Sequence, residues 1–179
     1  MDPRRRRTRE AVISALTRLA AQRRYDDINT GELVAAAGIG RSTFYEHFHG
    51  KDAVLLAAME PILLTLANAV VGRASRVQVR TTLKHLWDRR SLGRIILSSR
   101  AAALVQRRLA AIIAARLEAP GPAAAPSSMV AMAAAAGELA MLRMWLAGEA
   151  ACSANALAGQ MIALRRRDQQ DKQQELHGE

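Results

Sequence analysis

One short run of the sequence, residues 40–52, gathers side chains that can bind a nucleic acid; it reads GRSTFYEHFHGKD. Arg41 can donate two hydrogen bonds to a guanine edge, and the methyl group of Thr43 can contact the methyl group of a thymine. Other side chains of the run can hold a phosphate oxygen, a contact that fixes the register of a protein on DNA without reading its sequence. These phosphate-binding candidates are Tyr45, His47 and Lys51.

The elements that would position this run form a helix-turn-helix. Asn29 and Glu32 have the types and spacing of a capping box, so a short helix should begin at Thr30. Gly38 suits the left-handed residue that ends a helix, and Gly40 precedes a second short helix. The three predicted helices of this region, the first of them amphipathic, span residues 8–22, 30–37 and 41–47.

A simpler interpretation is an ordinary helix pair, because two short helices around a glycine are common in helical proteins. Phe44 and Phe48 are predicted core residues that hold the pair to the first helix, whatever its function. Tyr45 and His47 would then be merely exposed. Glu46 counts against DNA binding, since it places an acid where phosphates would approach.

The run 28–55, INTGELVAAAGIGRSTFYEHFHGKDAVL, resembles the DNA-binding segment of the tetracycline-repressor (TetR) family. The residues that meet the family pattern are Ile28, Leu33, Ala37, Gly38, Ile39, Thr43, Phe44, Tyr45, His47, Phe48 and Lys51. The resemblance implies a three-helix DNA reader, a helical C-terminal body, a homodimer on a palindromic operator, and repression relieved by a small ligand. The expected DNA-binding residues are Asn29, Thr30, Gly40, Arg41, Ser42, Thr43, Tyr45, His47 and Lys51.

Three positions depart from the family pattern. Asn29 replaces the usual Thr but caps a helix equally well. Arg24 stands where the first helix usually ends in Gly, so a left-handed residue there would cost about 1 kcal/mol. Gly40 replaces a common Ser, which costs a few tenths of a kcal/mol of capping and removes one possible phosphate contact.

Composition favours an all-α protein. Hydrophobic residues make up 50% of the chain and aromatic residues only 3%, so Ala and Leu, both strong helix formers, must fill the core. No alternating Val, Ile and Thr run bounded by turn residues predicts a strand. The predicted divisions are a DNA-binding domain at 6–66, with its helix-turn-helix at about 29–48, a helical effector-binding and dimerisation domain at 67–168, and a polar tail at 169–179.

Beyond the helix-turn-helix, the pattern predicts a long helix at about 51–71, kinked at Pro61. Two or three helices should follow at 77–117, with breaks at 91–93 and 98–99. A proline-rich loop should occupy 118–128. Further expectations are a helix capped by Ser127 or Ser128 and running to about Gly148, and a last helix at about 153–166.

The body should contain the ligand pocket and the dimer interface that the resemblance implies. Candidate pocket residues are Trp87, Val105, Leu109, Ile112 and Trp145. Candidate interface residues are Met132, Ala136, Met141, Trp145, Leu157 and Met161. Val105, Leu109 and Ile112 belong to an aliphatic stripe that has arginines towards the opposite face by helical spacing. Residues 73–116 hold eleven Lys and Arg against Asp88 alone, so we expect an effector that is aliphatic or anionic. The alternatives are a solvated arginine-rich surface in place of an effector site, and a monomer whose core contains the candidate interface residues.

Other function classes find little support. The single cysteine, Cys152, excludes an internal disulfide and a cysteine-based metal cluster. Histidines and acids do not converge at catalytic spacing, so no enzyme, metal or cofactor is expected. No run of about 18 apolar residues predicts a membrane span, and we expect a cytoplasmic protein. A helical protein that binds anionic surfaces through residues 73–116 remains the alternative, since the formal net charge is +10.

Overall fold

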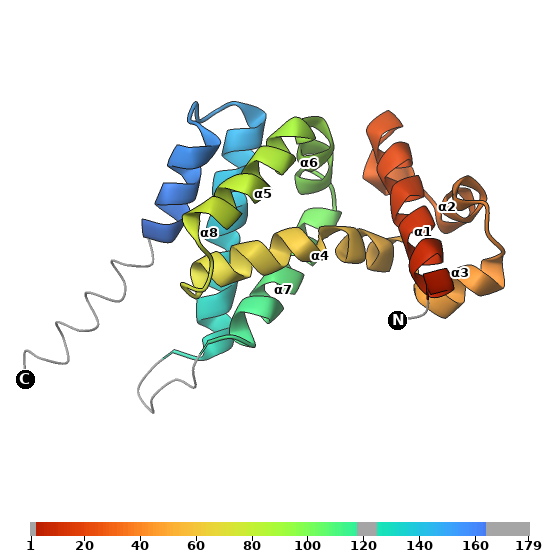
Figure 1. Ribbon diagram of the computed structural model, residues 1–179, viewed down its shortest axis with the longest axis horizontal. Helices are drawn as coiled ribbons and strands as arrows, with labels where there is room; N and C mark the ends of the chain where they lie inside the picture. The colour runs from red at the N-terminus through yellow and green to blue at the C-terminus, as the bar shows by residue number, and fades with distance from the viewer. Residues whose placement is uncertain (1–2, 118–124, 164–179) are drawn as a thin grey trace, which may run out of the picture. The chain divides into compact units, whose positions relative to one another are not determined.

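The computed structural model describes residues 3–117 and 125–163, and these residues form helices and no strand. This confirms the predicted all-α class. In chain order, the labelled helices are α1 (Pro3–Gln22), the 3₁₀ helix η1 (Tyr25–Asp27), α2 (Thr30–Ala37), α3 (Arg41–His47), α4 (Lys51–Val70), α5 (Arg76–Asp88), α6 (Arg90–Leu97), α7 (Ala101–Ala114) and α8 (Ser127–Ala147) (Figure 1). Residues 154–163 are also helical.

The chain divides into two compact units, and the division does not follow the order of the sequence. The first unit contains the described residues up to Pro61 together with Arg90–Val105. The second contains Ile62–Arg89 and the described residues from Gln106 onward. The division thus crosses α4 a few residues before the predicted boundary at 66/67. The return of α6 to the first unit was not predicted.

In the first unit, α1 packs against both α2 and α6, and the labelled helices α1, α2 and α3 gather together in Figure 1. Val12, Ala15 and Leu16 form the buried face of α1, as the apolar spacing of this segment predicts. Arg18 of α1 donates a hydrogen bond of 2.9 Å to the carbonyl of Ala36. The first helix thereby supports the helix-turn-helix along α2.

In the second unit, α8 contributes most to the core, with seven buried residues spread along its length. Gly148 ends α8 with a left-handed backbone (φ 81°), as predicted. The indole N–H of Trp145 donates a hydrogen bond of 2.9 Å to the carbonyl of Cys152. A guanidinium N–H of Arg76 donates to the carbonyl of Asn155 at 3.2 Å, which fastens the start of α5 to the helix at 154–163.

Several predicted boundaries are wrong. The first helix begins at Pro3 and not at Thr8, because proline suits the first helical position, where an N–H would have no partner. The predicted break at 91–93 falls inside α6, and the chain leaves the helix at Arg89 instead (φ −116°). Burial of Ile96 and Leu97 outweighs the helix-breaking tendency of the glycine in that helix.

The start of α8 also differs from the prediction. Its N-cap is Pro126, without a side-chain cap, and both candidate capping serines lie inside the helix. Proline lacks an N–H and its ring fixes φ near the observed −53°, so the helix starts directly after it. Most of the predicted loop at 118–128, the end of the last helix and the tail at 169–179 lie outside the described residues.

Two helices, α4 and α8, are long and apolar enough by length and composition to cross a membrane, with mean hydropathies of 1.9 and 1.4 over 18 residues. The sequence prediction overlooked both segments. Each helix also carries part of the core, for example Leu63 and Leu66 in α4 and Leu142 in α8. Core helices of soluble proteins commonly have this composition, so the two segments are weak signs of a membrane protein.

Candidate nucleic-acid interface

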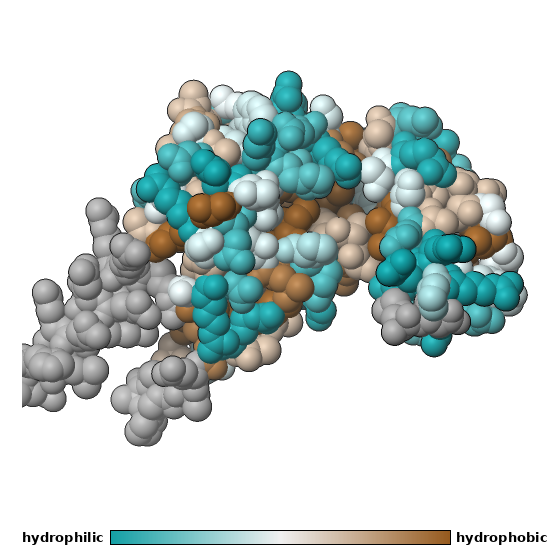
Figure 2. Space-filling view, viewed as in Figure 1, coloured by the Kyte–Doolittle hydropathy of each residue, from teal (hydrophilic) through white to brown (hydrophobic). Residues whose placement is uncertain are grey.

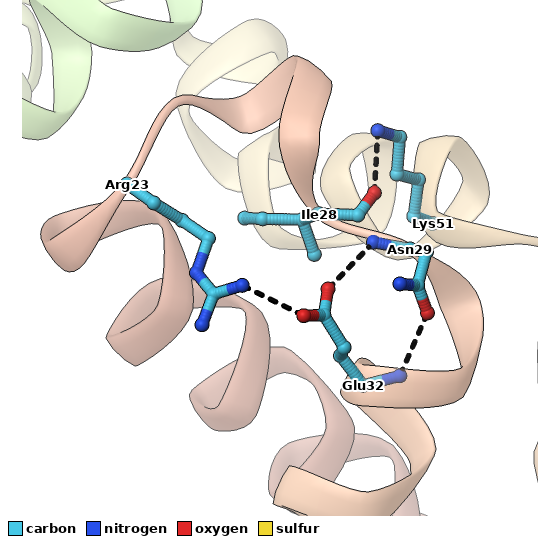
Figure 3. Close-up of polar contacts among 5 residues, drawn as sticks. All are labelled: Arg23, Ile28, Asn29, Glu32 and Lys51. Carbon is cyan, nitrogen blue, oxygen red and sulfur yellow. Dashed lines mark hydrogen bonds and ion pairs between the residues drawn. The ribbon is translucent and has the colours of Figure 1, made fainter.

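The entry to α2 is fixed by the predicted capping box (Figure 3). The backbone N–H of Glu32 donates to the Asn29 side chain at 2.9 Å, and the backbone N–H of Asn29 donates to the Glu32 carboxylate at 3.0 Å. Arg23 adds an ion pair of 2.7 Å to the same carboxylate. The bond from the Asn29 backbone, followed by Arg23, lowers the pKa of Glu32.

The turn between α2 and α3 depends on one left-handed glycine. Gly38 has φ 66° and ψ 34°, and its N–H donates to the carbonyl of Ala35 at 3.1 Å. Gly40 is extended (φ −73°), and its carbonyl accepts the first hydrogen bond of α3, from Phe44, at 3.0 Å. A residue with a Cβ pays about 1–2 kcal/mol in the left-handed conformation, so only Gly38 has a conformational reason to be glycine.

Phe44 and Phe48 hold α3 in place, as predicted from their spacing. Both rings are buried and their centroids lie 6.0 Å apart. Arg9 of α1 stacks on the Phe48 ring at 4.7 Å and donates to the carbonyl of His47 at 3.5 Å. Anchored in this way, α3 presents its opposite side to solvent.

Three of the predicted DNA-binding residues are exposed on α3. Arg41, Ser42 and Tyr45 are exposed, and 52% of Tyr45 is accessible. At 100° per residue these three positions span about a quarter of the helix circumference. Thr43 and His47 are half-buried beside them. Figure 2 shows hydrophilic surface over the region where α3 and the first turn of α1 lie.

Lys51 differs from its predicted role as a phosphate contact. Its ammonium group donates to three carbonyl oxygens, those of Ile28 at 2.6 Å, Tyr25 at 2.9 Å and Asp26 at 3.1 Å. An ammonium group has three N–H donors, so none is left for DNA in this arrangement. Here Lys51 positions the chain that leads into α2.

Tyr25 completes this cluster, which the sequence patterns did not reveal. Its buried ring lies 4.7 Å from the Lys51 ammonium, and its hydroxyl donates to Asp52 at 2.5 Å. Burial and then the bond to Asp52 raise the pKa of the Tyr25 hydroxyl above its ordinary value. Tyr25 thus joins η1 to Lys51 and Asp52 at the start of α4, about 26 positions further along the chain. A contact over this distance leaves no periodic pattern in the sequence.

Comparison with known proteins shows what this helix-turn-helix segment is similar to. Residues 12–58, which include all of α2 and α3, match the family described as "Bacterial regulatory proteins, tetR family". The match covers well under half of the chain, and it identifies this part as a TetR-type DNA-binding segment. The HTH-type transcriptional regulator EthR of Mycolicibacterium smegmatis is 39% identical over 53 residues, which are 30% of this chain. The match spans only 24% of that relative, so the likeness rests on the DNA-binding segment.

Solved structures extend the TetR likeness to the whole fold. A TetR transcriptional regulator from Streptococcus agalactiae 2603V superposes with a TM-score of 0.57 and 19% identity, covering 92% of this chain and 96% of that one. The dihydroxyacetone kinase operon activator DhaS gives a TM-score of 0.54 at 17% identity, covering 90% and 95%. The part of the chain after the DNA-binding segment therefore shares the helical fold of these two structures.

The predicted pocket residues of this helical body are mostly in the core. Val105, Leu109, Ile112 and Trp145 are buried, whereas Trp87 is 38% exposed. Val105 belongs to the first compact unit and the other four to the second. An open hollow of about 400 Å³ lies elsewhere, on α6, where it is lined by Ser91, Arg94, Ile95 and Ser98. The predicted effector residues stay a prediction.

The predicted dimer interface needs a correction at three positions. Trp145, Leu157 and Met161 are 3%, 6% and 1% exposed within the single chain, so they fill the core of their own unit and offer no surface to a second copy. Met132 is exposed, and Ala136 and Met141 are half-buried. Periodicity identified these residues as apolar, but it could not decide which side of each helix faces the interior.

The sequence prediction also missed one group of DNA-facing candidates. Because α1 begins at Pro3, its first turns carry exposed arginines, among them Arg5 and Arg7. Arg9, which follows them, contacts the end of α3. The charge run was visible in the sequence, but its attachment to the recognition region depended on where the helix begins.

Proposed function

We propose that this protein is a TetR-family regulator of transcription that inserts α3 into the major groove of a specific DNA site. The observation that carries the proposal is the two-sided character of α3. Phe44 is fully buried, whereas Arg41, Ser42 and Tyr45 are exposed. The major groove admits one α-helix and presents a distinct donor and acceptor pattern for each base pair. Arg41 at the first turn and Thr43 beside it are the proposed base readers.

Phosphate contacts are assigned to residues around the recognition helix. Thr30 begins α2, where free backbone amides and the partial positive charge of a helix N-terminus favour an anion. Tyr45 and His47 follow the base readers on α3, and Arg5 and Arg7 extend the positive surface on α1. Such contacts provide affinity and register, and they make binding salt-dependent.

The protein acts as a homodimer in this proposal, and the outer face of α8 is the proposed contact surface. Met129 and Met144 are 65% and 47% exposed, which is unusual for side chains of this size. With Ala133, Ala136 and Ala140 they share one side of the helix by its 3.6-residue period. Small residues between larger apolar ones allow two helices to approach closely. A two-fold dimer would match an inverted-repeat operator.

Repression relieved by a small-molecule effector, in the cytoplasm, completes the proposal. Its direction needs its own test, since one structural relative is named as an operon activator. A reporter gene placed behind the selected operator separates the two modes. A repressor lowers expression when the protein is present, and an activator raises it.

The proposal is tested by selecting bound duplexes from a random DNA library at moderate salt. Enrichment of an inverted repeat is the expected result. The Arg41→Ala variant should select poorly, whereas Arg80→Ala, which removes the same charge from an exposed position on α5, should select the same sequence as the wild type. Equal, salt-sensitive binding to every duplex, together with cosedimentation with anionic vesicles, would instead favour a general anion-binding surface.

A further inference from the structure

The second compact unit contains a buried acid whose carboxylate lacks a complete set of partners. Glu138, in the middle of α8, is 5% exposed. Within residues 3–117 and 125–163 it is the only charged side chain that is buried. Its Oε2 atom has no hydrogen-bond partner among the described residues. Buried polar atoms are nearly always paired, so an unpaired one requires an explanation.

The position of Glu138 on α8 excludes the dimer partner as the missing donor. Glu138 shares the core side of the helix with Ala131, Ala135, Leu142 and Trp145, which are all buried. The outer face proposed for dimerisation is centred about 180° away around the same helix. A second copy that docks on that face would lie across the full width of α8 from the carboxylate.

The preceding turn of α8 offers the Glu138 carboxylate no polar partner. Helical side chains lean toward the N-terminus, so the carboxylate extends over the preceding turn, which holds Ala134 and Ala135. These residues offer no polar side chain and little bulk. Burial raises the pKa of Glu138 to about 8. The Glu138 carboxyl is thus protonated at neutral pH, and burial of its unpaired oxygen in an apolar environment is unfavourable.

An aromatic pair lies further along the same side of α8. Trp145 follows Glu138 by seven residues, which is two helical turns or about 10 Å along the axis. Its ring stacks on Trp87 of α5 at 4.7 Å with an interplanar angle of 37°. The indole N–H of Trp145 is bonded to the carbonyl of Cys152, and its ring is buried. Trp87 is 38% exposed, so this pair extends from the core to the surface.

We propose that this unit binds a cationic amphiphile, a primary ammonium group joined to an aromatic or aliphatic body. Glu138 would accept hydrogen bonds from the ammonium group, and Trp87, the exposed member of the aromatic pair, would contact the apolar body, since aromatic faces attract both apolar groups and cations. This ligand class replaces the anionic effector that the arginine-rich composition suggests. The assignment of the ligand as effector rests on the proposed function, whereas its binding does not.

The test is isothermal titration of the full-length chain, without DNA, with 6-phenylhexylamine and with 6-phenylhexanoate. The two probes share a ring and a six-carbon chain and differ in the sign of their charge. The amine should bind and the carboxylate should not. Pairing with an ammonium group favours the ionised carboxylate, so at pH 7 about one proton should be released per amine bound. Phosphate and Tris buffers have different ionisation enthalpies. The difference between the binding enthalpies measured in the two buffers therefore gives the number of protons released.

Matched variants locate the site. Glu138→Gln keeps the shape of the side chain, and it should weaken amine binding by about tenfold or more and abolish the proton release, since a hydrogen bond to a charged group is lost. Glu149→Gln removes an exposed acid just after the same helix and should behave as the wild type. Trp87→Leu should weaken amine binding without changing the proton count.

The proposal is overturned if the amine gives no heat, if both probes bind alike, or if Glu138→Gln keeps the wild-type affinity and proton release. The wild-type comparison of the two probes decides the matter even if Glu138→Gln does not fold. Failure of ligand binding leaves the DNA selection untouched, because that experiment contains no ligand. Conversely, a chain that binds the amine but selects no DNA sequence would retain this site and lose the proposed regulatory function.

Discussion

The ammonium nitrogen of Lys51 lies 2.6 Å from the carbonyl oxygen of Ile28, so the first residue of α4 holds the segment that leads into α2. Ile28 directly precedes the N-cap Asn29, and its side chain is buried. The same ammonium group also binds two carbonyls of η1. A lysine that the sequence pattern suggests as a DNA contact is therefore a structural tie within the DNA-binding domain.

This arrangement predicts that Lys51→Met lowers the free energy of unfolding by about 1–3 kcal/mol, because hydrogen bonds from a charged group to half-buried carbonyls are lost. Urea denaturation followed by circular dichroism measures the change. Lys84→Met, which alters an exposed lysine of α5, is the control and should stay within about 0.5 kcal/mol of the wild type. Equal stability of both variants would mean that the three bonds contribute nothing.

The two glycines of the recognition turn should respond differently to substitution. Gly38→Ala forces a Cβ into a left-handed backbone (φ 66°) and should cost about 1–2 kcal/mol of stability. Gly40→Ser places a hydroxyl at the N-cap of α3, in an extended conformation in which the new Cβ meets only the side-chain oxygens of Ser42 and Thr43, both at 3.9 Å. This variant should gain a few tenths of a kcal/mol. Thermal unfolding of both variants checks the contrast, which equal losses would refute.

The buried acid of α8 predicts a pH-dependent stability. The pKa of Glu138 is 4.5 in an unfolded chain and about 8 in the folded one. Between these values the folded state holds a proton that the unfolded state has released, so stability falls as pH rises. The slope is up to about 1.4 kcal/mol per pH unit.

Glu138→Gln removes this pH dependence. The free energy of unfolding of the variant, relative to that of the wild type, should therefore rise by an amount on the order of 3 kcal/mol from pH 5 to pH 8. Urea denaturation of both proteins across that range gives the difference directly. Other titrating groups cancel in the comparison because both proteins contain them. Parallel stability curves would show that Glu138 is ionised in the folded chain or has a partner there.

The exposed methionines of α8 predict a mutation that separates dimerisation from folding. Met144→Glu introduces a charge at a position that is 47% exposed in the single chain, so the fold should persist. Two charges per dimer in an apolar contact should raise the dimer dissociation constant by at least about tenfold. Sedimentation equilibrium measures it, with Val77→Glu on α5, also exposed, as the control. A Met144→Glu protein that dimerises like the wild type would place the contact elsewhere.

The local features of the DNA-binding segment were predictable from sequence. The capping box of Asn29 and Glu32, the left-handed Gly38 and the anchors Phe44 and Phe48 each depend on neighbours within a few residues. Such short-range chemistry leaves a pattern in the sequence. The start and end of α2 and α3 were therefore correct to the residue.

Features that depend on distant parts of the chain were not predictable in the same way. The partners of Lys51 lie more than twenty residues away, and the packing of α6 against α1 joins segments about eighty residues apart. The interior position of Glu138 could not be inferred from the sequence. Small apolar residues occur on every face of α8, so its pattern does not indicate which face is buried. For the same reason Trp145, Leu157 and Met161 were assigned to an interface.

Base reading by α3 is tested most directly by the ratio of two dissociation constants at one salt concentration, one for the selected duplex and one for a scrambled duplex of equal length. The wild type should bind the selected duplex about a thousandfold more tightly or better, as specific DNA-binding proteins do. Arg41→Ala should reduce the ratio, which corresponds to a loss of about 1–3 kcal/mol of discrimination free energy per half-site, and it should relax the preference at one base pair. A wild-type ratio near one, or an Arg41→Ala protein that weakens on both duplexes equally, would contradict base reading by Arg41.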